Sequence, residues 1–111
     1  MIDSRATEQI LAQYARHGWK LRRVLLSAES KDLKTSVFAD AEIRDSPFDA
    51  LWFTRRSHPG TESWEIRRLA GSPFALVEIF DDGTPDTELE ERLAETENRM
   101  AETVTRGNGS A

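Results

Sequence analysis

The sequence predicts an α+β domain with the element order α-β-α-β-β-β-α, in which helices pack on a mostly antiparallel four-stranded sheet. Two observations lead to this class: apolar residues recur at helical spacing near both ends of the chain, and the middle contains short apolar runs separated by turn residues. At 111 residues the chain is short for two domains. We therefore expect a single domain over residues 1–105 and a disordered C-terminal tail over residues 106–111.

The first quarter of the chain predicts a helix followed directly by a strand. Apolar residues recur three and four apart over residues 4–17, and Gly18 can end this helix in a left-handed conformation. Residues 19–27 are rich in side chains that suit a pleated sheet and predict the first strand. Their two-residue alternation slips near Arg23, which leaves the register of this strand open.

The remaining elements follow in quick succession. Residues 31–41 predict a short helix, with a strand over residues 35–38 as the alternative. The segment from Arg44 to Pro47 predicts a turn. Two short turns join three further strands, which we expect over residues 49–56, 63–69 and 73–80. A long helix then begins near Pro85 and carries its apolar stripe on Leu89, Leu93, Met100 and Val104.

The predicted strands raise the question of what covers the sheet. Two helices are wide enough to cover one face of a four-stranded sheet, yet the strands over 49–56 and 73–80 are apolar on both sides. The second face therefore also needs a cover, either a further helix of the chain, a second subunit or a ligand. A symmetric dimer or a captured protein partner would use a set of large apolar residues: Trp52, Phe74, Leu76, Phe80, Leu93 and Met100.

Composition and charge argue against several classes of protein. The net charge is -5, and residues 73–111 hold 10 acidic against 3 basic residues, which argues against a nucleic acid as the partner. Because the chain has no Cys, it has no disulfide and no thiolate metal site. No apolar run approaches the roughly 20 residues that cross a bilayer, and no secretory signal is recognisable. We expect a cytoplasmic protein without a membrane partner.

The pattern Trp-x-x-Arg-Arg occurs three times, beginning at Trp19, Trp52 and Trp64. In a strand, each Trp shares a face with the second Arg of its repeat. A sheet face with these rings and guanidinium groups would suit an anion or a single-stranded nucleic acid, and its anion-binding residues would be Arg23, Arg56 and Arg68. The alternative is that the Arg stems cover apolar strand ends and their charged groups meet the acidic terminal helix.

No catalytic constellation is recognisable in the sequence. His17 falls in the last turn of a predicted helix and His58 in a hairpin loop, and neither belongs to a nucleophile motif. Asp81, Asp82 and Asp86 lack the spacing of a calcium loop, and the glycines form no phosphate-binding loop. We therefore predict no catalytic, cofactor-binding or metal-binding residue, and no cofactor.

A small acidic α+β chain with an amphipathic terminal helix broadly resembles the bacterial secretion chaperones, although the order of its elements differs from theirs. The resemblance implies an adaptor that shelters a protein partner. The residues themselves favour a small non-catalytic cytoplasmic interaction module, which forms a homodimer or captures a protein partner. Binding of an anion or a single-stranded nucleic acid is the alternative.

Overall fold

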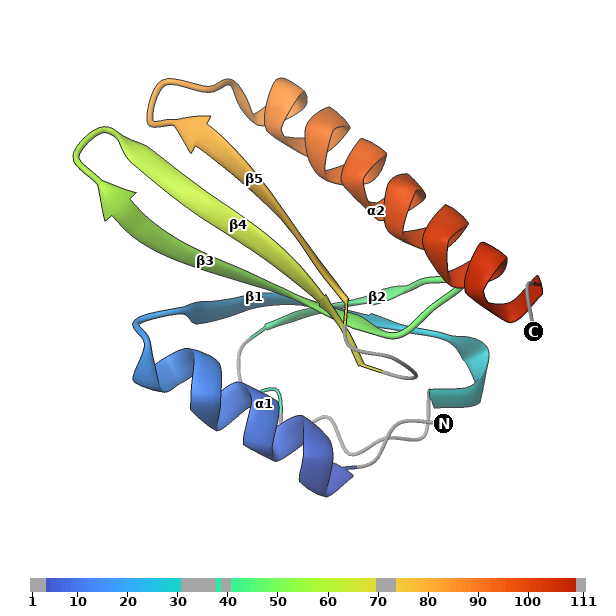
Figure 1. Cartoon of the computed structure of the whole chain (residues 1–111). Helices are drawn as coiled ribbons and strands as arrows, with labels where there is room; N and C mark the ends of the chain where they lie inside the picture. Colours follow the sequence, from blue (N-terminus) through green and yellow to red (C-terminus); the bar gives the residue numbers. More distant parts are fainter. Residues whose placement is uncertain (1–3, 31–37, 39–40, 70–73, 110–111) are drawn as a thin grey trace.

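The structure is a computed structural model that describes residues 4–30, 38, 41–69 and 74–109 (Figure 1). The described residues form two α-helices, a short 3-10 helix and five strands. In chain order these are α1 (Ser4–Arg16), β1 (Lys20–Leu26), η1 (Ala28–Ser30), β2 (Glu42–Asp45), β3 (Ala50–His58), β4 (Thr61–Arg68), β5 (Ala75–Asp81) and α2 (Asp86–Gly109). The predicted α+β class is confirmed.

The sheet differs from the predicted one in size and direction. Its strand order is β2-β1-β3-β4-β5, with β2 parallel to β1 and every other pair antiparallel. The sheet is therefore five-stranded and mixed, and the prediction of four strands is wrong by one edge strand. The extra strand lies where the sequence predicts only a turn from Arg44 to Pro47.

Strand β2 is short, charged and exposed along its whole length, which explains why the sequence pattern does not reveal it. Its backbone pairs with β1, and Ser46 N donates to Leu26 O at 3.0 Å just beyond the strand. Ion pairs join the Glu42 carboxylate to Arg23 Nε at 3.3 Å and to Arg44 Nε at 2.8 Å. Short, charged strands of this kind protect a sheet edge from pairing with other chains.

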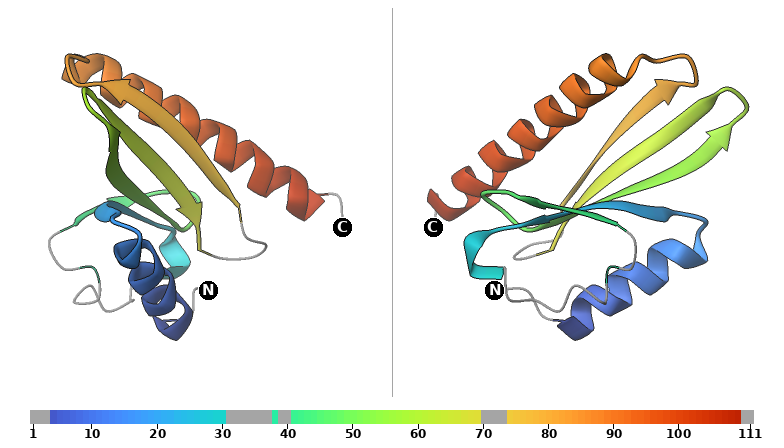
Figure 2. Two further views of the ribbon diagram at one scale, coloured as in Figure 1. Left: turned by 60° about the vertical axis from the view of Figure 1, so that its left-hand side comes forward. Right: turned by 180° about the vertical axis from the view of Figure 1, so that it is seen from behind.

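The two long helices lie on opposite faces of the sheet (Figures 1 and 2). α1 covers β1 and β3 on one side, and α2 lies along β5 on the other, so a further helix of the chain supplies the cover that the second face needs. Both faces of the central strands are consequently buried. This arrangement explains why the strand that begins at Ala50 is apolar on both sides.

Alternate residues of β3 enter two separate cores. Ala50 and Trp52 belong to the core under α2, together with Leu93 and Met100 of that helix. Residues 51 and 53, with side chains from β1, belong to the core under α1. The period of two in a strand sends neighbouring side chains to opposite faces, so a strand of consecutive apolar residues is what a sheet covered on both sides requires.

The first helix and strand form close to where the sequence predicts them. Gly18 has φ +86°, the left-handed conformation expected at the end of a helix. The register of β1 against β3 shifts between Leu21 and Arg23, which is the physical basis of the slipped alternation. The predicted helix over 31–41, and its alternative strand over 35–38, fall almost entirely outside the described residues.

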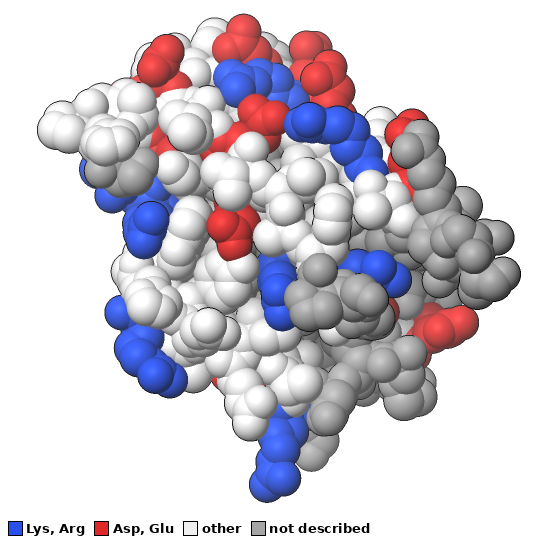
Figure 3. Space-filling model, in the orientation of Figure 1, with Lys and Arg blue, Asp and Glu red and all other residues white. Residues whose placement is uncertain are grey.

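The terminal helix α2 begins at Asp86, one residue after the predicted start near Pro85. It continues to Gly109, so it enters the segment for which a tail is predicted; the disorder of residues 106–111 stays a prediction. In the view of Figure 3, acidic side chains gather at the top of the molecule over this helix. Within the described ranges, no helix combines the length and apolar character needed to span a bilayer.

Candidate functional site

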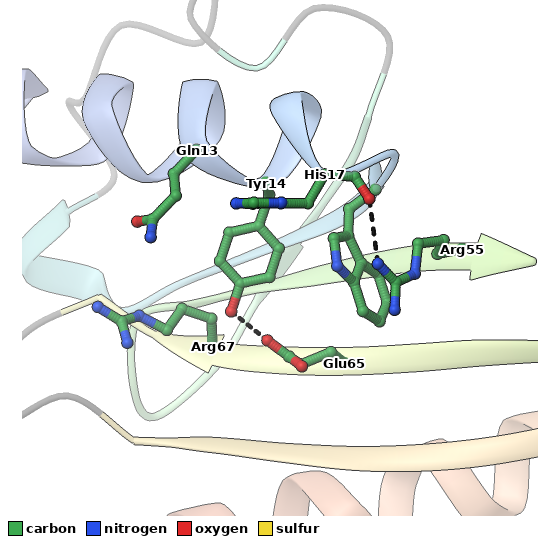
Figure 4. Close-up of a pocket in the computed structure, with 7 residues that line it drawn as sticks. Gln13, Tyr14, His17, Arg55, Glu65 and Arg67 are labelled. Carbon is green, nitrogen blue, oxygen red and sulfur yellow. Dashed lines mark hydrogen bonds between the residues drawn. The ribbon is translucent and has the colours of Figure 1, made fainter. Parts of the chain in front are cut away.

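A pocket opens on the α1 side of the sheet, between the C-terminal half of that helix and strands β3 and β4 (Figure 4). Its volume is about 310 Å³, at the lower end of the range for small-ligand sites. The lining residues come from the last turns of α1, the residue before β1, and the α1-facing positions of β3 and β4: Gln13, Tyr14, His17, Trp19, Arg55, Glu65 and Arg67.

Tyr14 forms the centre of one wall of the pocket. Its ring stacks on Phe53 with ring centroids 4.0 Å apart and meets Trp19 edge-on at 6.0 Å, and its hydroxyl donates a hydrogen bond to the Glu65 carboxylate (Figure 4). Burial and this hydrogen bond raise the pKa of Tyr14. The phenol is therefore protonated at every ordinary pH, and it fixes the position of Glu65.

Two guanidinium groups supply the positive charge of the pocket. Arg55 stacks over the Trp19 ring with 4.6 Å from its guanidinium carbon to the ring centroid, and it donates to His17 O at 3.1 Å. Arg67 lies beside the Tyr14–Glu65 pair (Figure 4). Its Nε is buried and has no hydrogen-bond partner among the described residues. A buried donor without a partner is unusual in a native protein and calls for an acceptor.

The same face of the sheet is open beyond the pocket, along β5. Val77 is 52% exposed and Ile79 is 57% exposed, and Ala75 is exposed beside them. The strand pairing places Val77 directly opposite Glu65 of the pocket. An apolar strip therefore continues from the pocket to the edge of the sheet.

The outer edge of β5 is partly closed by a side chain of α2. Arg68 N donates to Phe74 O at 2.9 Å, so the backbone groups of Phe74 point toward β4. Because backbone groups alternate in direction along an antiparallel strand, the N–H and C=O groups of Val77 and Ile79 point away from β4. Arg92 donates to the Ile79 carbonyl at 3.1 Å. This contact occupies one of the edge groups that another strand would need.

The structure does not bring the predicted anion-binding arginines together. Arg23 lies on the α2 side, where it pairs with Glu42 and Glu90, and Arg56 pairs with Asp82 at 3.0 Å near the other end of the sheet. The third of the set is Arg68, which is half-buried at the end of β4. The geometry favours the alternative, in which Arg side chains cover strand ends and meet acidic groups.

The predicted partner-interface residues lie inside the chain's own core. Trp52, Phe80, Leu93 and Met100 are all at most 3% exposed in the core under α2. The two others, Phe74 and Leu76, are partly buried against the same core. The use of these six residues in an interface stays a prediction. The exposed large apolar residues of β5 are Val77 and Ile79, which lie on the opposite face of that strand.

The two histidines differ in their surroundings. His17 is exposed at the mouth of the pocket, and His58 is exposed where β3 ends. Within the described ranges, no group of three or more His, Asp and Glu side chains is placed to hold a metal ion.

Sequence reasoning missed the pocket, although two signals for it exist. One residue of each Trp-x-x-Arg-Arg repeat reaches it: Trp19, Arg55 and Arg67. The second signal is that Glu65 and Arg67 are charged, although the β3 residues opposite them belong to the apolar core under α1. Charged residues in such a position mark a polar hollow under the helix.

Comparison with protein-family models, with curated proteins and with solved structures finds no match for this chain.

Proposed function

We propose that this chain is a small non-catalytic interaction module that self-associates through the open apolar face of β5. The observation that carries the proposal is the pair of large apolar side chains, Val77 and Ile79, which are more than half exposed on the same face of an edge strand. On the neighbouring strand β4, Ile79 is paired with the buried Ser63 and Val77 with the half-buried Glu65. A second copy of the chain supplies the cover that α1 does not reach.

The contact is made by the face of β5 and not by its edge. Pairing at the edge requires free peptide groups, and Arg92 already donates to the carbonyl of Ile79 there. Arg92 is itself held by Glu78 at 2.8 Å and by the ring of Phe80, with 4.2 Å from the guanidinium carbon to the ring centroid. Releasing it would break three contacts together, whereas the face is exposed without any rearrangement.

A twofold axis suits the order of side chains along the strand. From one end to the other, the open face carries Ala75, Val77, Ile79 and Asp81. A twofold axis that passes between Val77 and Ile79 places Val77 of one copy over Ile79 of the other copy, and Ile79 of the first over Val77 of the second. The two Asp81 carboxylates then lie at opposite ends of the contact, because the axis reverses the strand. A parallel arrangement would bring like charges together.

The area available makes this a weak, reversible dimer. Burying the exposed halves of four Val and Ile side chains contributes about 4 kcal/mol, which is of the same order as the free energy that association costs in lost translational and rotational freedom. With flanking contacts we expect a dissociation constant on the order of 0.1–1 mM.

Cysteine cross-linking tests the proposal sharply, because the chain has no cysteine of its own. After treatment with a short bifunctional maleimide, Val77→Cys is expected to form a cross-linked dimer, since the axis places the two copies of this position on facing sheet surfaces, near each other but too far apart for a direct disulfide. The matched control is Ile43→Cys on the opposite edge strand β2, where Ile43 is 41% exposed. Equal cross-linking of both variants, or none of Val77→Cys, would contradict the proposal.

A further inference from the structure

We propose that Arg92 blocks a second interaction surface, the outer edge of β5, which fits the β5 strand of another copy of this chain. Its guanidinium occupies a backbone carbonyl that the added strand would need, and it thereby keeps two copies from pairing edge to edge. This inference goes beyond the contact through the face of β5 and does not depend on it.

The outer edge of β5 has the geometry of a strand that can accept a neighbour. β5 is the last strand of the sheet, and α2 lies along it (Figure 1). The backbone groups of Val77 and Ile79 point away from β4, because those of Phe74 point toward it. An edge that stays unprotected pairs readily with another chain, and native proteins commonly block it with charged side chains.

Arg92 closes this edge near its middle. Its Nη2 donates to the Ile79 carbonyl at 3.1 Å and to the Glu78 carboxylate at 2.8 Å, and its guanidinium lies over the Phe80 ring. Arg99 also binds the Glu78 carboxylate, at 2.9 Å. Three consecutive residues of β5 therefore hold one guanidinium group on the carbonyl, where it excludes the peptide N–H of another strand.

The length of β5 defines the register that Arg92 blocks. The strand has seven residues, and Glu78 is at its centre. Two antiparallel copies pair along their whole length when the twofold axis passes through Glu78. In that register Val77 of one copy lies opposite Ile79 of the other, and its N–H would donate to the Ile79 carbonyl. This carbonyl is the group that Arg92 occupies.

Glu78 adds a second obstacle in the same register. On the axis it would lie directly opposite its own copy, in a pair that is not hydrogen-bonded, with Cβ atoms about 4.5–5.5 Å apart. Like charges directly opposite each other in a sheet are destabilising. Edge pairing is therefore opposed both by an occupied acceptor and by two facing carboxylates.

Disulfide formation at position 78 tests the inference, because the chain has no cysteine of its own. Glu78→Cys removes the facing charges and places a thiol where this register brings two copies within disulfide range. Adding Arg92→Met removes the donor but keeps an unbranched side chain beside Phe80. Under mild oxidation we expect the double variant to form a disulfide-linked dimer about tenfold faster or more than Glu78→Cys alone. The face contact cannot produce this disulfide, because Glu78 lies on the α2 side of the sheet.

Two controls isolate the contact with the backbone and the register. Arg99 binds Glu78 as Arg92 does, but its other hydrogen bond goes to the Thr96 hydroxyl. Arg99→Met added to Glu78→Cys should therefore give no faster cross-linking than Glu78→Cys alone. Val77→Cys with Arg92→Met should not form a disulfide, because position 77 would lie diagonal to its own copy, about 7–8 Å away.

Hydrogen exchange of the unmodified chain gives a second measurement, which requires no substitution. With the edge of β5 unpaired, the amides of Val77 and Ile79 should exchange rapidly, whereas those of Leu76 and Glu78, which point toward β4, should be protected. Circular dichroism verifies that each substituted chain is folded.

Three results would overturn the inference. The first is equal or absent cross-linking of Glu78→Cys with and without Arg92→Met. The second is equal acceleration by Arg92→Met and Arg99→Met, which would show that loosening the Glu78 cluster matters and the contact with the Ile79 carbonyl does not. The third is protection of the Val77 and Ile79 amides in the unmodified chain, which would show that the edge is already paired.

Discussion

Replacing Leu93 with alanine is expected to lower the free energy of unfolding by about 3 kcal/mol. Leu93 is 0% exposed and lies in the core that α2 forms with Trp52 and Trp64. Truncation removes three buried carbon atoms and leaves a cavity under the helix, where rigid indole rings limit collapse. For buried leucines the cost is about 2–5 kcal/mol, and a value of about 3 kcal/mol lies within that range.

Urea unfolding followed by circular dichroism measures this effect. With a denaturant dependence of about 2 kcal/mol per molar urea, the midpoint should fall by about 1.5 M. Leu89→Ala is the matched control, because Leu89 lies one turn earlier on the same helix and is only partly buried; it should cost about half as much.

The same experiment separates a core role of Leu93 from a role in a protein interface. A core residue destabilises the protein equally at every protein concentration, whereas an interface residue gives a cost that depends on concentration. A loss below about 1 kcal/mol, or a midpoint shift that changes with protein concentration, would refute the assignment of α2 as the internal cover of this face.

Three further substitutions test other contacts. Burial alone raises the pKa of Glu78, but hydrogen bonds from Arg92, Arg99 and Thr96, together with the charge of Arg92, lower it by more. The stability that Glu78 contributes is therefore complete above about pH 5 and is lost as pH falls through the lowered pKa. Glu78→Gln should therefore cost about 1 kcal/mol at pH 7 and less at pH 3 in urea unfolding; an equal cost at both would contradict this. Asp49 is buried and accepts Ser27 N at 2.7 Å and Ser30 Oγ at 2.9 Å, so Asp49→Ala should cost about 3 kcal/mol in the same assay, while a cost under about 1 kcal/mol would mean that these hydrogen bonds are replaceable. Gly60 has φ +83° in the β3–β4 hairpin, and a Cβ there would meet no atom within 4 Å. Gly60→Ala should therefore lower the free energy of unfolding by about 1 kcal/mol through backbone strain alone, measured by thermal unfolding. No loss would show that the turn relaxes.

Elements stabilised by local patterns could be predicted from the sequence. The stripe of α1 and the left-handed Gly18 are both properties of a few consecutive residues, and they fix that helix to within one residue. Strand β2 could not be predicted in this way. Its residues are charged and exposed, and what makes it a strand is pairing with β1, which lies about twenty residues earlier in the chain.

The placement of the helices depends on contacts that no local pattern encodes. Apolar residues on both sides of β3 indicate correctly that both faces are covered. They do not say which helix covers which face, because both α1 and α2 carry a single apolar stripe that fits either side. The candidate pocket was missed for the same reason: Trp19, Arg55 and Arg67 come together only through the register of three strands and the position of α1.

Sedimentation equilibrium of the full chain measures the proposed weak self-association through the face of β5. We expect an average mass near 12.6 kDa at low concentration, with a rise toward twice that value as the concentration approaches about 1 mM. Val77→Lys should abolish the rise, and Ile43→Lys on the opposite edge should preserve it. A constant mass of 12.6 kDa for the unmodified chain over the whole range would contradict the claim, as would a rise that Val77→Lys leaves intact.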